Sequence, residues 1–255
     1  MSATPAVLAV AGLAKTFAGF RAVQDVAFTV EAGELVALIG PNGAGKTTTF
    51  NMINGQLKPD AGRVLLDGRD VTGMASRELW RRGVARTFQI TATFASMTVI
   101  ENIIVALISR DRTAGRAIVM DPRHRDEALV LLGEIGMMPA ADRVCGVLAY
   151  GDLKRVELAL ALVNAPRLLL MDEPTAGMAP NERGALMGLV ARIARERRTA
   201  VLFTEHDMDV VFRHADRILV MNRGKLIASG RPEEVRRNPL VREVYLGAGA
   251  ASGQG

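Results

Sequence analysis

The sequence predicts an α/β protein built on a mainly parallel sheet, with an N-terminal antiparallel β subdomain and a helical subdomain inserted in the middle. The apolar run "ELVALIG" at residues 34–40 leads into a glycine-rich loop and a helical pattern. Further apolar runs at residues 167–173 and 199–205 alternate with helical segments. Strands that alternate with helices form parallel sheets whose faces the helices cover.

The first elements of the chain are expected to be antiparallel strands. The apolar stretch at residues 6–14 has no basic residue before it and continues into Lys15 and Phe17, which favours a first strand over a secretory signal. The run "VLLDGRDV" at residues 64–71 contains an Asp-Gly pair, which is typical of a hairpin turn. From about residue 91 to residue 149 the strand pattern fades, so we expect a helical insertion there.

These observations predict one domain of residues 7–247, with a core of residues 7–90 and 165–247 and a helical subdomain of about residues 91–164. The chain has 255 residues, 49% of them hydrophobic, which is enough to bury a core of that size. The end of the chain, "GAGAASGQG", is of low complexity, so residues 248–255 are expected to form a flexible tail. No run of about 18 apolar residues occurs, so we expect a cytoplasmic protein without a membrane span.

The second half of the chain contains a helix whose start is unusual. From Leu153 its apolar residues recur on one face, through Val156, Leu160 and Val163, and the pattern stops at residues 164–166. Before it, a Tyr-Gly pair stands where a serine or threonine cap is usual, so the first N–H groups lack an obvious partner. The remaining elements are a helix at residues 181–198, the strand at residues 199–205 and a hairpin at residues 217–230 that turns at residues 222–224.

The composition argues against several classes of function. The single cysteine, Cys145, excludes a disulfide framework and a cysteine-based zinc site, and we expect it to be a small buried residue. The net charge of +5 comes from an arginine-rich set with clusters at residues 123–125, 195–198 and 236–237. Because these clusters are short and interleaved with acids, they indicate solvated helix faces, and no nucleic acid partner is expected.

The glycine-rich loop at residues 40–48 carries the first chemical motif. Its sequence, "GPNGAGKTT", fits the spacing G-x-x-x-x-G-K-[ST] between a predicted strand and a predicted helix. The glycines let backbone N–H groups surround phosphates, Lys46 reaches the outer phosphates, and the Thr47 hydroxyl binds Mg²⁺. The residues of this P-loop, which predicts a bound nucleoside triphosphate, are Gly40, Pro41, Asn42, Gly43, Ala44, Gly45, Lys46, Thr47 and Thr48.

Two adjacent acids, Asp172 and Glu173, end the apolar run at residues 167–173. Such a pair alone could be a turn. Beside a P-loop it predicts hydrolysis, with Asp172 in the Mg²⁺ shell and Glu173 polarising the attacking water. His206 follows another predicted parallel strand, at the edge where ligands gather, although a lone histidine is more often structural. Phe17 alone would be a core residue.

These motifs, in this order, resemble the ATP-binding subunit of ABC transporters over about residues 8–247. The resemblance implies that residues 40–48 are the Walker A loop and residues 168–172 the Walker B strand, with ATP and Mg²⁺ as ligands. The other residues that it implies are the catalytic base Glu173, the switch histidine His206, the Q-loop residue Gln89 with a catalytic and metal-binding role, and Phe17 stacked on adenine.

The resemblance also answers the question of the unusual helix start. In this family the signature helix points its N-terminus across a dimer interface at the γ-phosphate held by the other subunit. This sequence departs from the family pattern at three positions. Ala149 lacks a hydroxyl donor, Asp152 stands where glutamine is usual, and Ala179 replaces the Asp or Asn of the D-loop. The residues in the place of the signature are Leu148, Ala149, Tyr150, Gly151 and Asp152.

A finer resemblance is to the branched-chain amino acid importer group, through "RTFQ", "MTVIENI", "LAYGD", "PTAGMAP" and "VYLG". It implies a second ATPase subunit, identical or related, two membrane permease subunits whose coupling helix docks near residues 91–108, and indirectly a periplasmic solute-binding protein. The chain would then be peripheral at the cytoplasmic face of the inner membrane. The alternatives are a urea or amide importer, a lipopolysaccharide exporter, a soluble ABC ATPase acting on nucleic acid or ribosomes, and a nucleotide-binding regulator without turnover.

Overall fold

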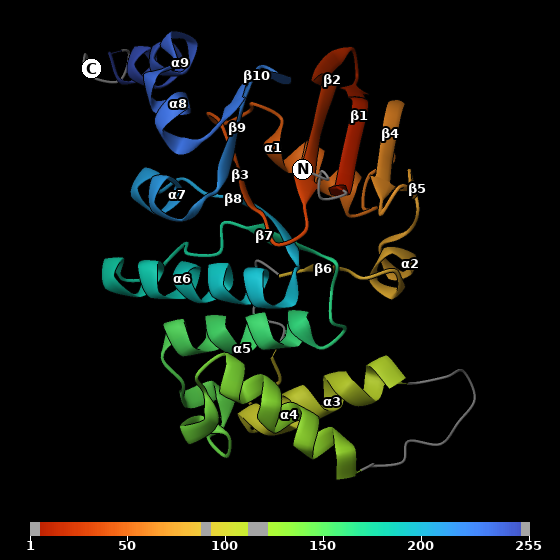
Figure 1. Cartoon of the computed structure of the whole chain (residues 1–255), viewed down its shortest axis with the longest axis vertical. Helices are drawn as coiled ribbons and strands as arrows, with labels where there is room; N and C mark the ends of the chain where they lie inside the picture. Colours follow the sequence, from red (N-terminus) through yellow and green to blue (C-terminus); the bar gives the residue numbers. More distant parts are fainter. Residues whose placement is uncertain (1–5, 88–92, 112–121, 251–255) are drawn as a thin grey trace, which may run out of the picture.

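The computed structural model describes residues 6–87, 93–111 and 122–250, and its strands form two sheets (Figure 1). The four-stranded sheet has the order β2-β1-β4-β5, and every neighbouring pair in it is antiparallel. The turn at residues 67–68 joins its last two strands, which confirms the antiparallel part predicted from sequence. The strands are β1 (Ala6–Phe17), β2 (Phe20–Glu31), β4 (Ala61–Leu66) and β5 (Arg69–Asp70).

The six-stranded sheet has the order β10-β9-β3-β8-β7-β6. Its neighbours are parallel except for the hairpin of β9 and β10, as the sequence predicts. The carboxyl ends of β3, β7 and β8 therefore meet at one edge, where ligands bind in sheets of this kind. The strands are β3 (Leu35–Ile39), β6 (Val84–Arg86), β7 (Leu168–Asp172), β8 (Ala200–Thr204), β9 (Arg217–Asn222) and β10 (Lys225–Gly230).

The helices α3, α4 and α5 gather at the end of the molecule opposite the antiparallel sheet (Figure 1). This placement fits the expected helical insertion, whose exact boundaries stay a prediction. None of the helices in the described ranges has both the length and the apolar character needed to cross a membrane. The helices are α1 (Lys46–Ile53), α2 (Ser76–Arg81), α3 (Val99–Asp111), α4 (Pro122–Glu134), α5 (Tyr150–Leu162), α6 (Pro180–Arg197), α7 (Met208–His214), α8 (Pro232–Arg237) and α9 (Pro239–Ala250), with short 3₁₀ turns at Met138–Ala140 and Cys145–Val147.

The central strand β3 is buried on both faces, which is why its sequence is apolar without interruption. Leu35, Ala37 and Ile39 pack into the core that includes α3, α5 and α6. Val36 and Leu38 pack into a second core, shared with α1 and the antiparallel sheet. The loop after β3 is thus held by a strand that is fixed from both sides.

The helix predicted from Leu153 in fact begins at Tyr150, with Ala149 as its N-cap. It lies between α6 on one side and α3 and α4 on the other (Figure 1). Because the helix is covered on two sides, its buried residues are not confined to the single apolar face that the sequence predicts. The charged residues Lys154 and Glu157 are buried, while Leu160 is only half-buried.

Other sequence-based expectations can be compared with the structure in the same way. Cys145 is buried, as predicted, and its Sγ lies 3.3 Å from Nδ2 of Asn102. The arginine-rich cluster at residues 123–125 was expected to be solvated, but its His124 is buried on the inner face of α4. The Nε2 of His124 lies 3.0 Å from Oδ2 of Asp111. At the C-terminus, α9 runs to Ala250, so the helix includes residues 248–250 of the predicted tail; alanine favours helix most strongly of all residues.

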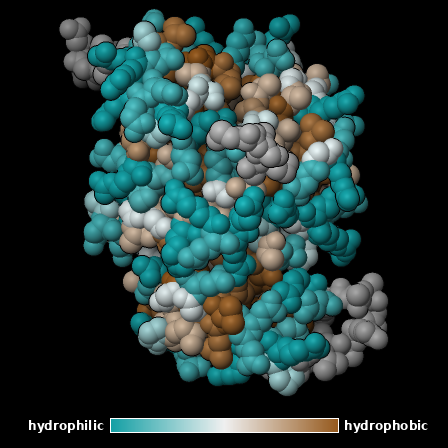
Figure 2. Space-filling view, in the orientation of Figure 1, coloured by the Kyte–Doolittle hydropathy of each residue, from teal (hydrophilic) through white to brown (hydrophobic). Residues whose placement is uncertain are grey.

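The face of the molecule shown in Figure 2 is hydrophilic over most of its area, with hydrophobic patches both at the helical end and at the opposite end. The exposed large hydrophobic residues of the helical end include Val130 on α4 and Met138. The mixed surface agrees with a globular domain that has a buried core, as the composition predicts.

Candidate functional site

The loop between β3 and α1 has a backbone that requires glycine at two positions. Gly40 has φ 155° and Gly45 has φ 101°. A Cβ atom at Gly40 would lie 2.2 Å from the carbonyl oxygen of Met221, and one at Gly45 would lie 2.5 Å from that of Ala22. Only glycine fits at both positions, so the loop can fold tightly and turn its N–H groups inward.

Lys46, the first residue of α1, reaches back over this loop. Its Nζ donates to the carbonyl oxygens of Gly40, at 2.7 Å, and Pro41, at 3.2 Å. Burial lowers the pKa of Lys46, while the nearby carboxylates of Glu173 and Asp172 act in the opposite direction. The ammonium group is thus held where a phosphate chain would replace the two carbonyls as its partner.

A cleft of about 350 Å³ opens beside the loop. It brings together residues from the antiparallel sheet, the loop, and the ends of β7 and β8, which are distant in sequence. Its predicted members are Phe17, Asn42, Gly43, Ala44, Gly45, Lys46, Thr47, Thr48, Asp172, Glu173 and His206. Gly40 and Pro41 do not line the cleft but hold Lys46, and Gln89 lies outside the described residues.

The two acids at the end of β7 are held in different ways. The Asp172 carboxylate accepts hydrogen bonds from the Thr204 hydroxyl, at 2.6 Å, and from Arg86, at 3.1 Å. Glu173 has φ 49°, a backbone conformation that costs free energy in a non-glycine residue and recurs at functional sites. Its N–H donates to the hydroxyl of Thr204 at 3.1 Å, and its Oε1 lies 2.8 Å from Nε2 of His206. The Glu173 carboxylate and the His206 ring are therefore within hydrogen-bond distance of each other.

The expectation that Phe17 is a core residue, which rested on its residue type alone, is wrong. Phe17 is 45% exposed and lines the cleft, so it is not a core residue. The adenine contact that the resemblance implies for Phe17 stays a prediction.

The five signature residues do not line this cleft. The N–H groups of Tyr150, Gly151 and Asp152 have no acceptor within the described ranges, and Ala149 offers no capping side chain. Gly151 lies close to the Glu182 carboxylate. A Cβ atom at Gly151 would be 3.0 Å from Oε1 of Glu182. The start of α5 is therefore uncapped by the described part of its own chain.

The side chains of the cleft suit one kind of metal ion. In the described ranges, no group of three or more His, Cys, Asp or Glu residues could hold a metal by itself. The cleft offers the Asp172 carboxylate and the Thr47 hydroxyl, which are oxygen ligands. Mg²⁺ is usually bound by one or two carboxylates together with substrate phosphates, so these residues fit Mg²⁺.

Sequence reasoning missed several residues of the site. Thr204, Phe20 and Ala22 line the cleft, and Arg86 contacts Asp172. Thr204 could have been found from its place at the end of a central parallel strand. Phe20 and Ala22 lie in none of the motifs, and Arg86 begins "RTFQ", where only Gln89 was given a role.

The parallel sheet with its P-loop, paired acids and uncapped signature helix defines an ATP-binding cassette, which is a class of ATPase. The chain belongs to the ABC transporter family, whose model matches residues 23–176. A second model, described as branched-chain amino acid ATP-binding cassette transporter, matches residues 225–251. This membership confirms the sequence-based family assignment, and the chain is an ATPase whose hydrolysis is coupled to transport.

The similar proteins cover almost the whole chain. A high-affinity branched-chain amino acid transport ATP-binding protein, LivG of Salmonella typhimurium, is 42% identical over 94% of this chain and 98% of its own length. A crystal structure of an ABC transporter cassette in its ADP conformation has a TM-score of 0.86 and 32% identity, covering 95% of this chain and 99% of that one. A dimeric cassette bound to ADP and Pi has a TM-score of 0.73 and 26% identity, covering 88% and 98%.

Proposed function

We propose that this chain is the ATP-hydrolysing subunit of a branched-chain amino acid importer. The observation that carries the proposal is the separate match of residues 225–251 to a model of branched-chain amino acid cassettes. That segment lies outside residues 23–176, so its match adds to the general ABC match. LivG, similar over almost its entire length, is named for the same transport, which supports this choice over the urea, amide or lipopolysaccharide systems.

We assign each residue a role from its position in the cleft. The N–H groups of the loop and Lys46 bind the phosphates, and Thr47 and Asp172 hold Mg²⁺. Held by these two residues, the ion would supply positive charge that offsets the negative charge of the phosphates. Glu173 orients the attacking water and accepts its proton, while His206, 2.8 Å from Glu173, holds that carboxylate in place. Gln89 keeps its predicted role near the metal.

A second ATPase subunit, identical or related, would complete each site. The proposal is supported by the N–H groups of Tyr150, Gly151 and Asp152, which lack acceptors within the described ranges, and by the dimeric cassette that resembles this chain. A helix N-terminus with free N–H groups attracts an anion. Because Ala149 has no hydroxyl, these backbone groups would bind the γ-phosphate held by the other subunit.

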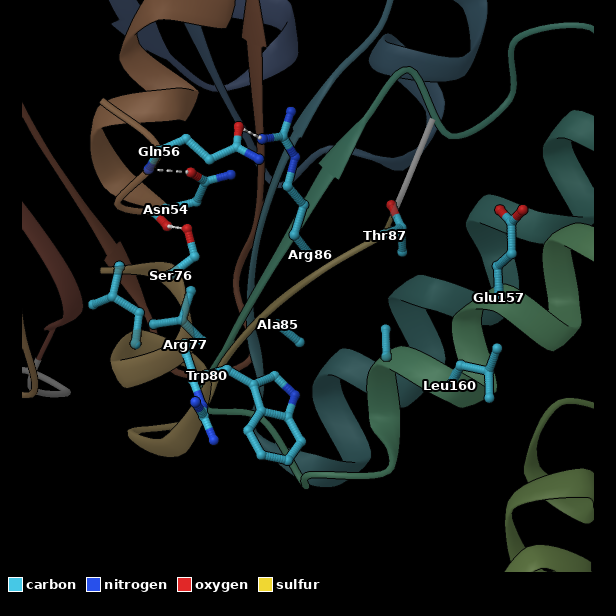
Figure 3. Close-up of a pocket in the computed structure, with 13 residues that line it drawn as sticks. Asn54, Gln56, Ser76, Arg77, Trp80, Ala85, Arg86, Thr87, Glu157 and Leu160 are labelled. Carbon is cyan, nitrogen blue, oxygen red and sulfur yellow. Dashed lines mark hydrogen bonds between the residues drawn. The ribbon is translucent and has the colours of Figure 1, made fainter. Parts of the chain in front are cut away.

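A pocket of about 310 Å³ between α2, β6 and α5 is the surface that we assign to a permease (Figure 3). Its walls include Trp80 and Leu160, with Arg77 on α2 and Glu157 on α5 as charged groups. Thr87 lines the pocket and comes shortly before the segment at residues 91–108, where a coupling helix was expected to dock. An apolar groove with charged groups suits an amphipathic helix. The chain would then be peripheral at the inner membrane, beside a permease served by a solute-binding protein.

Gentle solubilisation of membranes tests the proposal directly. The tagged chain, isolated without added ATP, is expected to bring with it two very hydrophobic permeases and an ATPase subunit, identified by mass spectrometry. Cells that lack the chain should lose high-affinity uptake of labelled leucine and regain it with the wild-type chain. Recovery of ribosomes or nucleic acid in place of permeases would contradict the proposal and favour a soluble ABC ATPase.

The docking surface can be tested with two arginines on the same helix. Arg77 is exposed and lines the pocket, whereas Arg81 is exposed and does not line it. Arg77→Glu reverses a charge inside the proposed interface, so we expect permease recovery to fall about tenfold, by analogy with other interfacial charges. Arg81→Glu is the matched control and should behave as wild type in the same pull-down. Equal recovery with both variants would place the permease elsewhere.

A further inference from the structure

Arg86 contacts both the permease pocket and the Asp172 carboxylate. It ends β6, beside β7 in the parallel sheet, and its side chain is 17% exposed. One guanidinium nitrogen donates to Oδ2 of Asp172 at 3.1 Å. The other donates to Oδ1 of Asn51 at 3.0 Å. It also donates to Oε1 of Gln56 at 2.8 Å (Figure 3).

These contacts fix the orientation of the Asp172 carboxylate. Thr204 bonds one of its oxygens and Arg86 the other, and the Asp172 side chain is only 8% exposed. Groups that orient a metal ligand tune its affinity for the metal. By charge alone, however, a guanidinium this close would repel Mg²⁺. The contacts and the charge of Arg86 thus predict effects of opposite sign, which makes its role measurable.

We propose that Arg86 is a positioning residue of the Mg²⁺ site, which holds the Asp172 carboxylate in the orientation that binds the metal. The guanidinium is itself held by Asn51 and by Gln56, and Gln56 lies in the wall of the permease pocket. The inference depends on the proposed role of Asp172. It adds a residue that the P-loop and acid motifs do not contain.

The experiment measures the Mg²⁺ concentration that gives half-maximal binding of a fluorescent ATP analogue to the purified chain at constant ionic strength. Arg86→Lys keeps the charge but not the planar fork, and Arg86→Met removes both. If Arg86 positions Asp172, both variants should require about tenfold more Mg²⁺. Gln56→Ala should shift the requirement in the same direction by less. Arg167→Met, which breaks an exposed pair with Asp67, is the matched control and should leave it unchanged.

A lower Mg²⁺ requirement in Arg86→Met with no change in Arg86→Lys would show a purely electrostatic effect and overturn the proposal. No change in either variant would also overturn it. If a thermal melt shows that an Arg86 variant is misfolded, the exposed Gln56→Ala variant decides, since it removes only one bond to the fork. Failure of the wild-type chain to bind the analogue with Mg²⁺ would instead contradict the proposed function.

Discussion

Glutamine in place of Glu173 is expected to lower the turnover of ATP by about a hundredfold or more while leaving ATP binding intact. A carboxamide has the shape of the carboxylate but cannot accept the proton of the attacking water. In the proposed function the phosphate contacts come from the loop and Lys46, which line the same cleft and which the substitution leaves in place. Phosphate release under saturating ATP and the binding of a fluorescent ATP analogue measure the two properties separately.

Lys46→Ala provides the contrast, because it removes the ammonium group that the loop carbonyls hold and that we propose binds the phosphates. This variant should lose binding and hydrolysis together, so the two substitutions separate affinity from chemistry. Full turnover in Glu173→Gln would remove Glu173 from the mechanism. Absence of hydrolysis in the wild-type chain would favour a regulator without turnover.

The same variant tests the second subunit. If the γ-phosphate lies between the loop of one subunit and the start of α5 of the other, Glu173→Gln with ATP and Mg²⁺ should accumulate as a dimer. Light scattering in size-exclusion chromatography would detect it. A chain that pairs only with a related subunit should stay monomeric until that subunit is added.

The elements that the sequence predicts well are those with local causes. The strand β3, the loop and the start of α1 follow from an apolar run, glycine spacing and a lysine, all within residues 34–48. Asp172 ends a buried strand and Glu173 follows it, so their place at the sheet edge needs no knowledge of distant residues. The pairing of strands into a parallel sheet follows from the alternation of strand and helix.

The positions of the residues that sequence reasoning missed or misjudged depend on contacts with residues distant in sequence. Phe17 looks like a core residue until the antiparallel sheet places it, partly exposed, at the cleft. Arg86 begins the stretch "RTFQ", which assigns it no role in the site, and its partners Gln56 and Asp172 lie 30 and 86 residues away in sequence. The buried charges of α5 follow from a helix covered on two sides, which a single apolar stripe does not reveal.

Lys154→Met is expected to destabilise the chain by about 3–5 kcal/mol, because it leaves a buried carboxylate without its cation. The Nζ of Lys154 lies 2.9 Å from Oε2 of Glu157, with side chains 9% and 5% exposed. The other oxygen of Glu157 has no hydrogen-bond partner in the described ranges, so Lys154 is its main compensation. The substitution also removes the contact of Nζ with the ring of Tyr150, 5.3 Å away. Thermal melts should show a fall of roughly 10 °C, at about 2–4 °C per kcal/mol for a domain of this size.

The double variant Lys154→Met, Glu157→Leu separates the cost of an unpaired charge from the value of the pair. Replacing a buried ion pair with apolar residues of similar size is often neutral or stabilising, because the desolvation cost of both charges disappears. The double variant should therefore recover most of the lost stability, although Glu157 also lines the permease pocket. If it is as unstable as Lys154→Met alone, the loss comes from packing around Lys154. If it is stable but recovers less permease in the pull-down, the buried pair serves docking more than folding.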